Sequence, residues 1–183
     1  MINIPNLLTL SRLAILPVII LLILTEGVLG ENGVWLAFIL YIIAAATDFV
    51  DGWLARKLNQ TSDFGTFLDP ISDKIFIGAL LIIFAGVGRI YGLWLIPAVL
   101  ILSREILVSG LREYLGPKNI QLPVTKLAKW KTTAQMLALG LLIIGPYIPF
   151  GLITGHIALT GAAIITLITG WEYMKVGLDH MKL

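Results

Sequence analysis

Residues 13–24 read LAILPVIILLIL, an uninterrupted apolar run that follows Arg12. A helix that crosses a membrane needs about 20 apolar residues, and this run supplies more than half of one span. No A-x-A cleavage motif follows the run and only Arg12 stands before it as a cation, so a first span that stays in place is favoured over a cleaved signal peptide. The lipid bilayer is therefore expected to set the fold.

The composition of the whole chain agrees with this first segment. Hydrophobic residues make up 58% of the 183 positions and charged residues 13%, with a mean hydropathy of +0.94, whereas soluble domains have about 45–50% and about 25%. We expect an all-α integral membrane protein in which residues 1–183 form a single domain. The net charge of +2 and the lack of a basic stripe argue against nucleic acid as a partner, and zero cysteines exclude disulfides and thiolate metal sites.

Six apolar segments are expected to cross the membrane. Residues 2–11, with Pro5 and Asn6 near their start, are expected to form a short interfacial helix or turn ahead of the first span. The connections are short, which predicts a compact helical bundle. The expected spans are residues 12–29, 34–55, 70–88, 93–114, 127–146 and 153–175.

The distribution of lysine and arginine predicts the orientation of this bundle. With the N-terminus placed in the cytoplasm, only Arg89 falls on the outer side. Both termini, and the acidic residues described next, are then cytoplasmic, in the inner membrane of a cell. The cations that fall on or near the inner side are Arg12, Arg56, Lys57, Lys74, Arg104, Arg112, Lys118, Lys126, Lys129, Lys131, Lys175 and Lys182.

Four aspartates gather at the ends of the second and third expected spans. Asp48 and Asp51 are spaced i, i+3, and Asp69 and Asp73 are spaced i, i+4, so each pair shares one helix face. Carboxylates near a bilayer are costly unless cations hold them. Residues 57–68 are expected to form a tight turn that brings the two pairs to face each other.

Two facing carboxylate pairs make an all-oxygen site for Mg²⁺ or Mn²⁺, and two such ions about 3.5–4 Å apart can clamp a diphosphate during displacement at phosphorus. Gly52 and Gly65 would let a nucleotide come close, and Arg56 is placed to meet a phosphate. The alternative is that the aspartates only cap helices and pair with cations, and Asp69 before Pro70 has the pattern of an N-cap. Four aspartates with interleaved glycines make that alternative the weaker one.

The spacing of these residues resembles the signature of the CDP-alcohol phosphotransferase family at every fixed position. Two further segments, residues 4–12 (IPNLLTLSR) and residues 103–113 (SREILVSGLRE), resemble bacterial phosphatidylglycerophosphate synthases. The matching signature is Asp48-x2-Asp51-Gly52-x2-Ala55-Arg56-x8-Gly65-x3-Asp69-x3-Asp73.

The resemblance implies transfer of a phosphatidyl group from CDP-diacylglycerol to glycerol 3-phosphate with release of CMP, using two divalent cations, Mg²⁺ or Mn²⁺, in a homodimer. It implies that Asp48, Asp51 and Asp69 bind metal and that Asp73 both binds metal and acts as the general base on the acceptor hydroxyl. The residues that it places at the CDP-diacylglycerol group are Gly52, Arg56, Ser62, Gly65, Asn6 and Thr9.

Glycerol 3-phosphate would bring a second anion to the site. Arg104 and Arg112 lie eight residues apart, close to one helix face, and Lys126 and Lys131 open the fifth span. We expect these four cations to bind the acceptor phosphate, with Glu105 orienting them. The alternative is that they serve only the positive-inside bias or reach toward lipid headgroups.

Two other functions compete with this one. The same donor chemistry can use another acceptor, such as inositol phosphate, serine or choline, and the aspartates do not distinguish between them. A cation-coupled transporter would also place acids in a membrane, but transport sites usually sit near the bilayer midplane, and this sequence has no second acidic layer.

Overall fold

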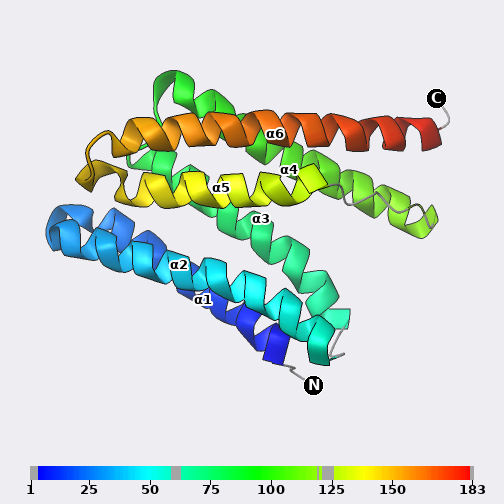
Figure 1. Ribbon diagram of the computed structural model, residues 1–183, viewed down its shortest axis with the longest axis horizontal. Coiled ribbons are helices and arrows are strands. Elements are labelled where there is room, and N and C mark those ends of the chain that lie inside the picture. The colour runs from blue at the N-terminus through cyan, green and yellow to red at the C-terminus, as the bar shows by residue number, and fades with distance from the viewer. Residues whose placement is uncertain (1–3, 59–62, 119, 121–125, 182–183) are drawn as a thin grey trace.

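The computed structural model describes residues 4–58, 63–118, 120 and 126–181, and the side chains of residues 4, 5, 48–58, 63, 66, 126, 128 and 129 lie outside the described part. Over these residues the chain is helical and contains no strand, which confirms the all-α prediction (Figure 1). The long helices are α1 (Ile4–Leu24), α2 (Glu26–Leu58), α3 (Asp63–Gly86), α4 (Leu95–Leu115), α5 (Lys126–Ile144) and α6 (Gly151–His180), and the short 3-10 turns are η1 (Gly92–Trp94), η2 (Gly116–Lys118) and η3 (Gly145–Tyr147).

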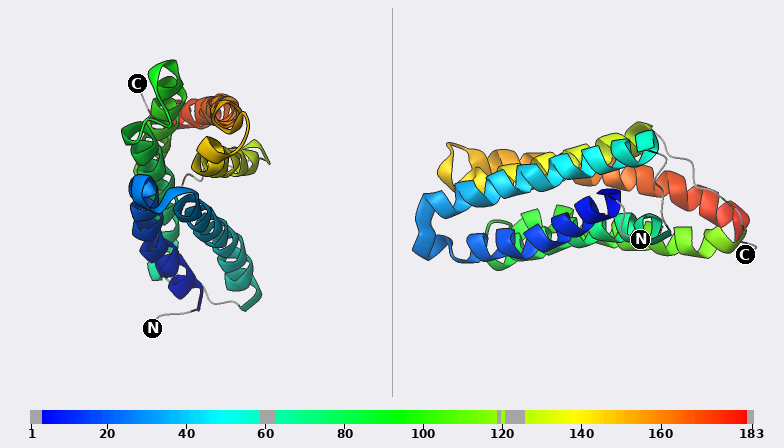
Figure 2. Two further views of the ribbon diagram at one scale, coloured as in Figure 1. Left: turned by 90° about the vertical axis from the view of Figure 1, so that its left-hand side faces the viewer. Right: turned by 90° about the horizontal axis from the view of Figure 1, so that it is seen from below.

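The helices run up and down in one elongated bundle. α1 packs on α2, α6 packs on α4 and α5, and α3 joins the two groups through contacts with α1, α4 and α5. Figures 1 and 2 show both chain ends at the same end of the bundle. We call this the terminal end; the last turns of α2 and α4 also lie there, and the turns after α1, α3 and α5 lie at the opposite, distal end.

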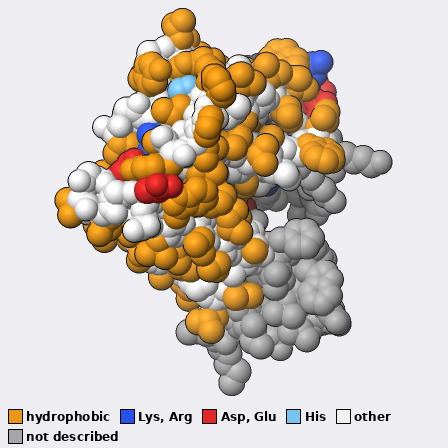
Figure 3. Space-filling model, turned by 60° about the vertical axis from the view of Figure 1, so that its left-hand side comes forward, with side chains coloured by type: hydrophobic (Ala, Val, Ile, Leu, Met, Phe, Trp, Pro, Cys, Tyr) orange, Lys and Arg blue, Asp and Glu red, His pale blue; other side chains and the backbone are white. Residues whose placement is uncertain are grey.

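Much of the bundle surface is apolar, as expected for a protein in lipid. Exposed large hydrophobic residues occur on every long helix, and they cover most of the described surface in Figure 3. Over the described residues, α1, α2, α4 and α6 contain stretches long and apolar enough to cross a membrane. The chain is therefore a multi-pass membrane protein.

The other two long helices, α3 and α5, carry charged residues near the terminal end. These are Asp63, Asp69, Asp73 and Lys74 in α3 and Lys126, Lys129 and Lys131 in α5. Each helix thus has an apolar part toward the distal end and a polar part toward the terminal end, and the six-span count stays a prediction.

Close contacts between helices build the core of the bundle. Tyr41 of α2 donates a hydrogen bond to the Met136 carbonyl of α5 at 2.6 Å and stacks on Phe76 of α3, with 5.8 Å between the ring centroids. Gly140 of α5 lets the Tyr41 ring approach closely, because a Cβ there would lie 3.3 Å from Tyr41 Cε1. Since lipid supplies little driving force for helix association, such close packing and hydrogen bonds hold the bundle together.

The distal end is closed by a buried arginine. Arg89, after α3, donates to Glu26 Oε2 at 2.5 Å and to the carbonyls of Leu142 and Ile143 at 3.0 and 2.5 Å. The ring nitrogen Nε2 of His156 lies 2.7 Å from the Arg89 carbonyl oxygen. These contacts tie α3 to the start of α2, the end of α5 and the start of α6.

The first helix corrects the predicted N-terminal segment. The separate interfacial helix expected at residues 2–11 is wrong over the described residues, because residues 4–11 are the first turns of α1. Pro5 stands in the first turn, where its missing N–H costs nothing, and no helix breaker follows before Pro17. α1 also ends at Leu24 rather than near residue 29.

Two further boundaries differ from expectation. α2 begins at Glu26 and is interrupted at Gly30, whose φ of 60° and ψ of −152° suit glycine alone. α3 begins at Asp63, so Asp69 and Pro70 lie inside the helix, and the N-cap assigned to Asp69 is wrong. The proline interrupts only one backbone hydrogen bond near the start of α3, and the helix continues on both sides of it. The turn between α2 and α3 is consequently shorter than residues 57–68.

Candidate active site

Two of the four predicted acidic residues are described in full, and they share one face of α3. Asp69 and Asp73 are spaced i, i+4, which places their Cβ atoms about 5–6 Å apart. Asp69 is exposed, and the Asp73 side chain keeps 38% of its surface accessible. Both carboxylates therefore remain reachable at the terminal end of the bundle.

Helix α1 contacts both carboxylates. The Thr9 hydroxyl donates to Asp69 Oδ1 at 2.8 Å, and Arg12 Nη1 donates to Asp73 Oδ1 at 2.5 Å. Thr9 and Arg12 are each 1% exposed, so these contacts are made from inside the bundle. Sequence reasoning placed Thr9 at the edge of the donor and gave Arg12 no role in the site; the signal that was missed is a cation three residues after a hydroxyl in an apolar helix.

The second acidic pair lies on the last turns of α2. The α2 backbone places Asp48, Asp51, Gly52 and Arg56 near the terminal end, while their side chains lie outside the described residues, as does Ser62 entirely. Only four residues separate α2 from α3, so the facing helix ends are at most about 17 Å apart. Among the other residues expected at the donor, Gly65 is buried in the first turns of α3 and Asn6 is buried on α1.

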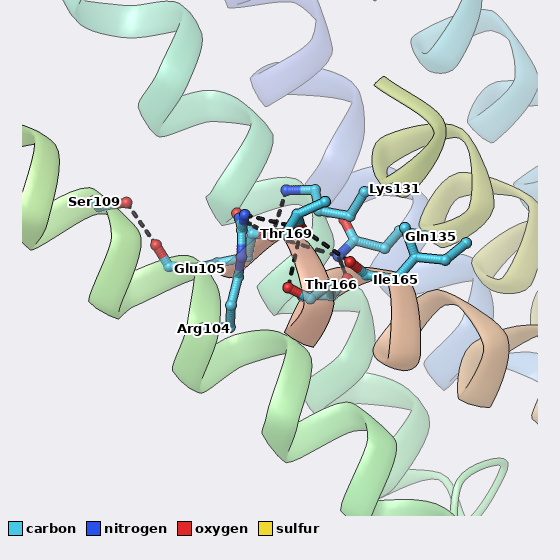
Figure 4. Close-up of polar contacts among 8 residues, drawn as sticks. All are labelled: Arg104, Glu105, Ser109, Lys131, Gln135, Ile165, Thr166 and Thr169. Atoms are coloured by element: carbon cyan, nitrogen blue, oxygen red, sulfur yellow. Dashed lines mark hydrogen bonds and ion pairs between the residues drawn. The ribbon is translucent and has the colours of Figure 1, made fainter. Parts of the chain in front are cut away.

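Cations from two other helices meet at one carboxylate. Lys131 Nζ of α5 donates to Glu105 Oε1 of α4 at 2.5 Å, and Arg104 Nη1 donates to the same oxygen at 3.3 Å (Figure 4). Gln135 Nε2 lies 3.4 Å from that oxygen and 2.9 Å from the Thr166 hydroxyl of α6. Glu105 thus pairs with two of the cations that it is expected to orient, and the orienting role itself stays a prediction.

Arg104 is held in a slot formed by α6. Its Nη2 donates to the Thr169 hydroxyl at 3.1 Å, and its guanidinium carbon lies 5.4 Å from the centre of the Tyr173 ring. A Cβ added to Gly170 would lie 2.8 Å from Arg104 Cγ, so the missing side chain makes room for the arginine. Arg112 reaches the same Tyr173 ring at 5.7 Å.

Three of the four cations expected to bind the acceptor phosphate, Arg104, Arg112 and Lys131, thus come together around Glu105 and Tyr173; the side chain of Lys126 lies outside the described residues. We call Arg104, Glu105, Arg112, Lys131 and Tyr173 the cation group.

Lys74 connects the cation group to the acids. It follows Asp73 on α3, and the charges of Glu105, Arg112 and Asp73 all act on it. Lys74, Arg104, Arg112 and Lys131 bring four positive charges to this region, against the negative charges of Glu105 and Glu172. The region beside Asp73 therefore has an excess of positive charge that favours an anion.

Several buried polar atoms near the cation group lack a partner. Arg104 Nε, Gln135 Oε1, Glu172 Oε2 and the Tyr173 hydroxyl have no hydrogen-bond partner among the described residues. Buried polar groups are nearly always paired with protein, water or ligand. Unpaired atoms on three neighbouring helices indicate that a polar molecule or water belongs here.

The donor set on α3 fits a hard divalent cation. Asp69 and Asp73 offer carboxylate oxygens, and both side chains stay accessible beside the end of α2. Among the side chains that the structure describes, no group of three or more His, Cys, Asp or Glu gathers. A complete site would consequently need Asp48 and Asp51 as well.

Comparison with known proteins identifies the family of this chain. The family model of CDP-alcohol phosphatidyltransferase matches residues 2–171. Proteins named CDP-diacylglycerol–glycerol-3-phosphate 3-phosphatidyltransferase are similar over nearly their whole length: that of Rickettsia typhi is 43% identical, covering 94% of this chain and 96% of the relative, and that of Bacillus subtilis is 37% identical, covering 100% and 98%. The relative from Haemophilus influenzae is 37% identical and covers 99% of this chain and 98% of its own. The chain therefore belongs to the CDP-alcohol phosphatidyltransferase family.

Proposed function

We propose that this protein transfers the phosphatidyl group of CDP-diacylglycerol to glycerol 3-phosphate, which yields phosphatidylglycerophosphate and CMP. Its relatives from three bacteria are named for this donor and acceptor, and the alignments span nearly the full chains. The structural observation that carries the proposal is the excess of positive charge beside Asp73, from Lys74, Arg104, Arg112 and Lys131.

The acceptor phosphate is the proposed occupant of the cation group. Arg104 and Lys131 are buried and already share one carboxylate, Glu105, so their positions are set before a ligand arrives. An acceptor without net charge, such as serine, would not need the cluster of lysine and arginine side chains that lies beside the aspartates. An acceptor that carries its own phosphate would gain from it.

The proposed reaction also needs a base, and α3 supplies it. In the proposed mechanism, the hydroxyl oxygen of the acceptor attacks the phosphorus that bears the diacylglycerol. The Asp73 carboxylate accepts the proton of that hydroxyl as the new bond forms. The bond from that phosphorus to the CMP oxygen breaks, and CMP leaves with the electron pair. Bound divalent cations, Mg²⁺ or Mn²⁺, would neutralise charge on the diphosphate during this displacement.

The proposed donor site lies between α2 and α3. In this proposal Asp48, Asp51, Asp69 and Asp73 would hold the divalent cations, which would neutralise charge on the donor diphosphate. The residues proposed to contact the CDP group are Gly52, Arg56, Ser62 and Gly65, with Asn6 nearby. We further propose six spans with the terminal end in the cytoplasm of the cell, and a homodimer.

A panel of acceptors tests the proposed function. The purified protein in lipid nanodiscs would be given CDP-diacylglycerol and Mg²⁺ with glycerol 3-phosphate, inositol phosphate, serine or choline, and CMP release would be measured. We expect release only with glycerol 3-phosphate at comparable concentrations. Release with serine alone would remove the proposed acceptor, and cation flux into proteoliposomes without CMP release would remove the enzyme.

A further inference from the structure

The inner face of α1 carries a line of polar residues in an otherwise apolar helix. Asn6, Thr9 and Arg12 follow one another at three-residue intervals, so they lie near one face of the helix. All three are buried, with at most 3% of their surface exposed. A buried arginine in a membrane helix is costly unless a partner compensates it, so this face has a specific partner.

That partner is the acidic face of α3. Thr9 contacts Asp69 and Arg12 contacts Asp73, and the two helices run in the same direction. Three residues of α1 advance about 4.5 Å and four residues of α3 advance about 6 Å, so the two contacts are nearly in step along the helices. A slip of α1 by one turn would break both contacts.

The contacts restrain the carboxylates and leave them accessible. Each one uses Oδ1 and comes from a side chain that is 1% exposed, whereas Asp69 is exposed and Asp73 keeps 38% of its surface accessible. The guanidinium donates to an ionised oxygen, which makes a strong and directional hydrogen bond. The carboxylates are thus contacted from inside the bundle and keep part of their surface accessible.

We propose that Thr9 and Arg12 are positioning residues that fix the side-chain orientation of Asp69 and Asp73 for the cation and substrate that these acids meet. The proposal rests on the proposed role of the two aspartates. Residues that orient metal ligands through hydrogen bonds typically contribute about 10- to 100-fold to metal affinity or activity. Thr9 accordingly acts through Asp69 and not on the nucleotide.

A purely structural role is the competing explanation, and the molecule contains a matched control for it. Arg89 and Glu26 form an ion pair at the distal end with the same 2.5 Å distance, and Arg89 is likewise buried. For the hydroxyl, Thr160 donates to the carbonyl of His156 at 2.9 Å within α6, so Thr160→Val shows the effect of losing a threonine hydroxyl that contacts neither Asp69 nor Asp73. If Arg12 only holds helices together, Arg12→Lys should behave like Arg89→Lys. If the Thr9 hydroxyl has no role toward the metal, Thr9→Val should bind Mn²⁺ as well as Thr160→Val does.

The experiment uses substitutions that keep the charge of each site. Thr9→Val removes the hydroxyl and Arg12→Lys removes the forked geometry, so neither effect can arise from a changed net charge. The controls are Thr160→Val and Arg89→Lys. For each full-length protein in nanodiscs, Mn²⁺ binding would be measured by electron paramagnetic resonance without substrate, together with thermal unfolding, kcat and the KM of both substrates.

We expect Thr9→Val to weaken Mn²⁺ binding and Arg12→Lys to lower kcat, each by about 10-fold or more, with melting temperatures within the range of the controls. Thr9→Ser should restore Mn²⁺ binding, because it restores the hydroxyl. Wild-type Mn²⁺ affinity in Thr9→Val together with an unchanged kcat in Arg12→Lys would overturn the proposal. If Arg12→Lys fails to fold, Mn²⁺ binding by Thr9→Val and Thr9→Ser decides the matter. Use of a different acceptor by the wild type would refute the proposed function alone, since Mn²⁺ binding is measured without an acceptor.

Discussion

Replacing Gly170 by alanine tests whether the position of Arg104 governs acceptor binding. Gly170 faces the base of the Arg104 side chain, and an added Cβ would lie 2.8 Å from Cγ and 3.1 Å from Nε. Ordinary van der Waals contacts begin at 3.4 Å. Arg104 Cγ would therefore have to move away by about 0.6 Å, the difference between 3.4 and 2.8 Å. Because Cγ lies near the backbone, a change of rotamer at the far end of the arginine does not relieve this contact.

The displacement has a predictable effect on the contacts of Arg104. Its hydrogen bonds to Thr169 and Glu105 are already long, at 3.1 and 3.3 Å, and a shift of about 0.6 Å would take them beyond normal hydrogen-bonding distance. A hydrogen bond to a charged group contributes about 1.5–3 kcal/mol, so mispositioning one such donor should weaken binding of the acceptor phosphate roughly 10- to 100-fold. The donor lipid does not use Arg104 in the proposed mechanism.

The assay is steady-state CMP release with each substrate varied in turn. For Gly170→Ala we expect the KM of glycerol 3-phosphate to rise by about 10-fold or more, with the KM of CDP-diacylglycerol unchanged. Gly161→Ala is the matched control on the same helix, because a Cβ there would meet nothing within 4 Å. That control should keep both KM values and gain slightly in stability, as alanine favours helix.

Three results would refute this reasoning. An unchanged KM for glycerol 3-phosphate in a folded Gly170→Ala protein would mean that Arg104 is not the phosphate ligand or is not confined by α6. A rise in the donor KM alone would move Arg104 to the nucleotide. An equal effect of Gly161→Ala would show that added helix propensity, and not the contact with Arg104, causes the change.

Other expectations concern the base, the core and the orientation. Asp73→Asn should lower turnover at least about 100-fold while cytidine nucleotide binding partly remains, as measured by CMP release and nucleotide titration; near-normal turnover would contradict the base assignment. Tyr41→Phe should lower the free energy of unfolding by about 1 kcal/mol in thermal melts without changing activity, because it removes the hydrogen bond to Met136; an unchanged melting temperature would contradict that contribution. Since the chain has no cysteine, Val28→Cys and Lys118→Cys can be labelled in intact cells with an impermeant maleimide. Only Val28→Cys should react, and the reverse pattern would invert the proposed orientation.

The apolar pattern of the sequence predicted the later helices more closely than the first three. α4 was expected at residues 93–114 and runs from Leu95 to Leu115, because turns that begin with glycine, at Gly92 and Gly116, bound it on both sides. The start of α3 was misplaced because Pro70 reads as a helix start, whereas seven residues before it are also helical. The pattern could not separate a proline that begins a helix from one that lies near its beginning.

For the site, spacing within one helix was informative and pairing between helices was not. The i, i+4 spacing correctly placed Asp69 and Asp73 on one face of α3. The contacts of Thr9 with Asp69 and of Arg12 with Asp73 join residues that are 60 and 61 positions apart, so no local sequence pattern predicts them. Likewise, the grouping of Lys131 with Arg104 depends on the packing of both α4 and α5 against α6.

The buried ion pairs of this bundle are arranged so that they can set the register of its helices. In lipid, apolar side chains gain little by choosing one neighbour over another, so a polar pair that must be satisfied selects the alignment. Arg12 with Asp73 does this between α1 and α3, and Lys131 with Glu105 does it between α5 and α4, both at or toward the terminal end. At the distal end Arg89 joins α3 to the start of α2. The pairs that align the helices near the terminal end are therefore also those that hold Asp73 and the cation group in position, so the packing of the helices and the geometry of the candidate site depend on the same contacts.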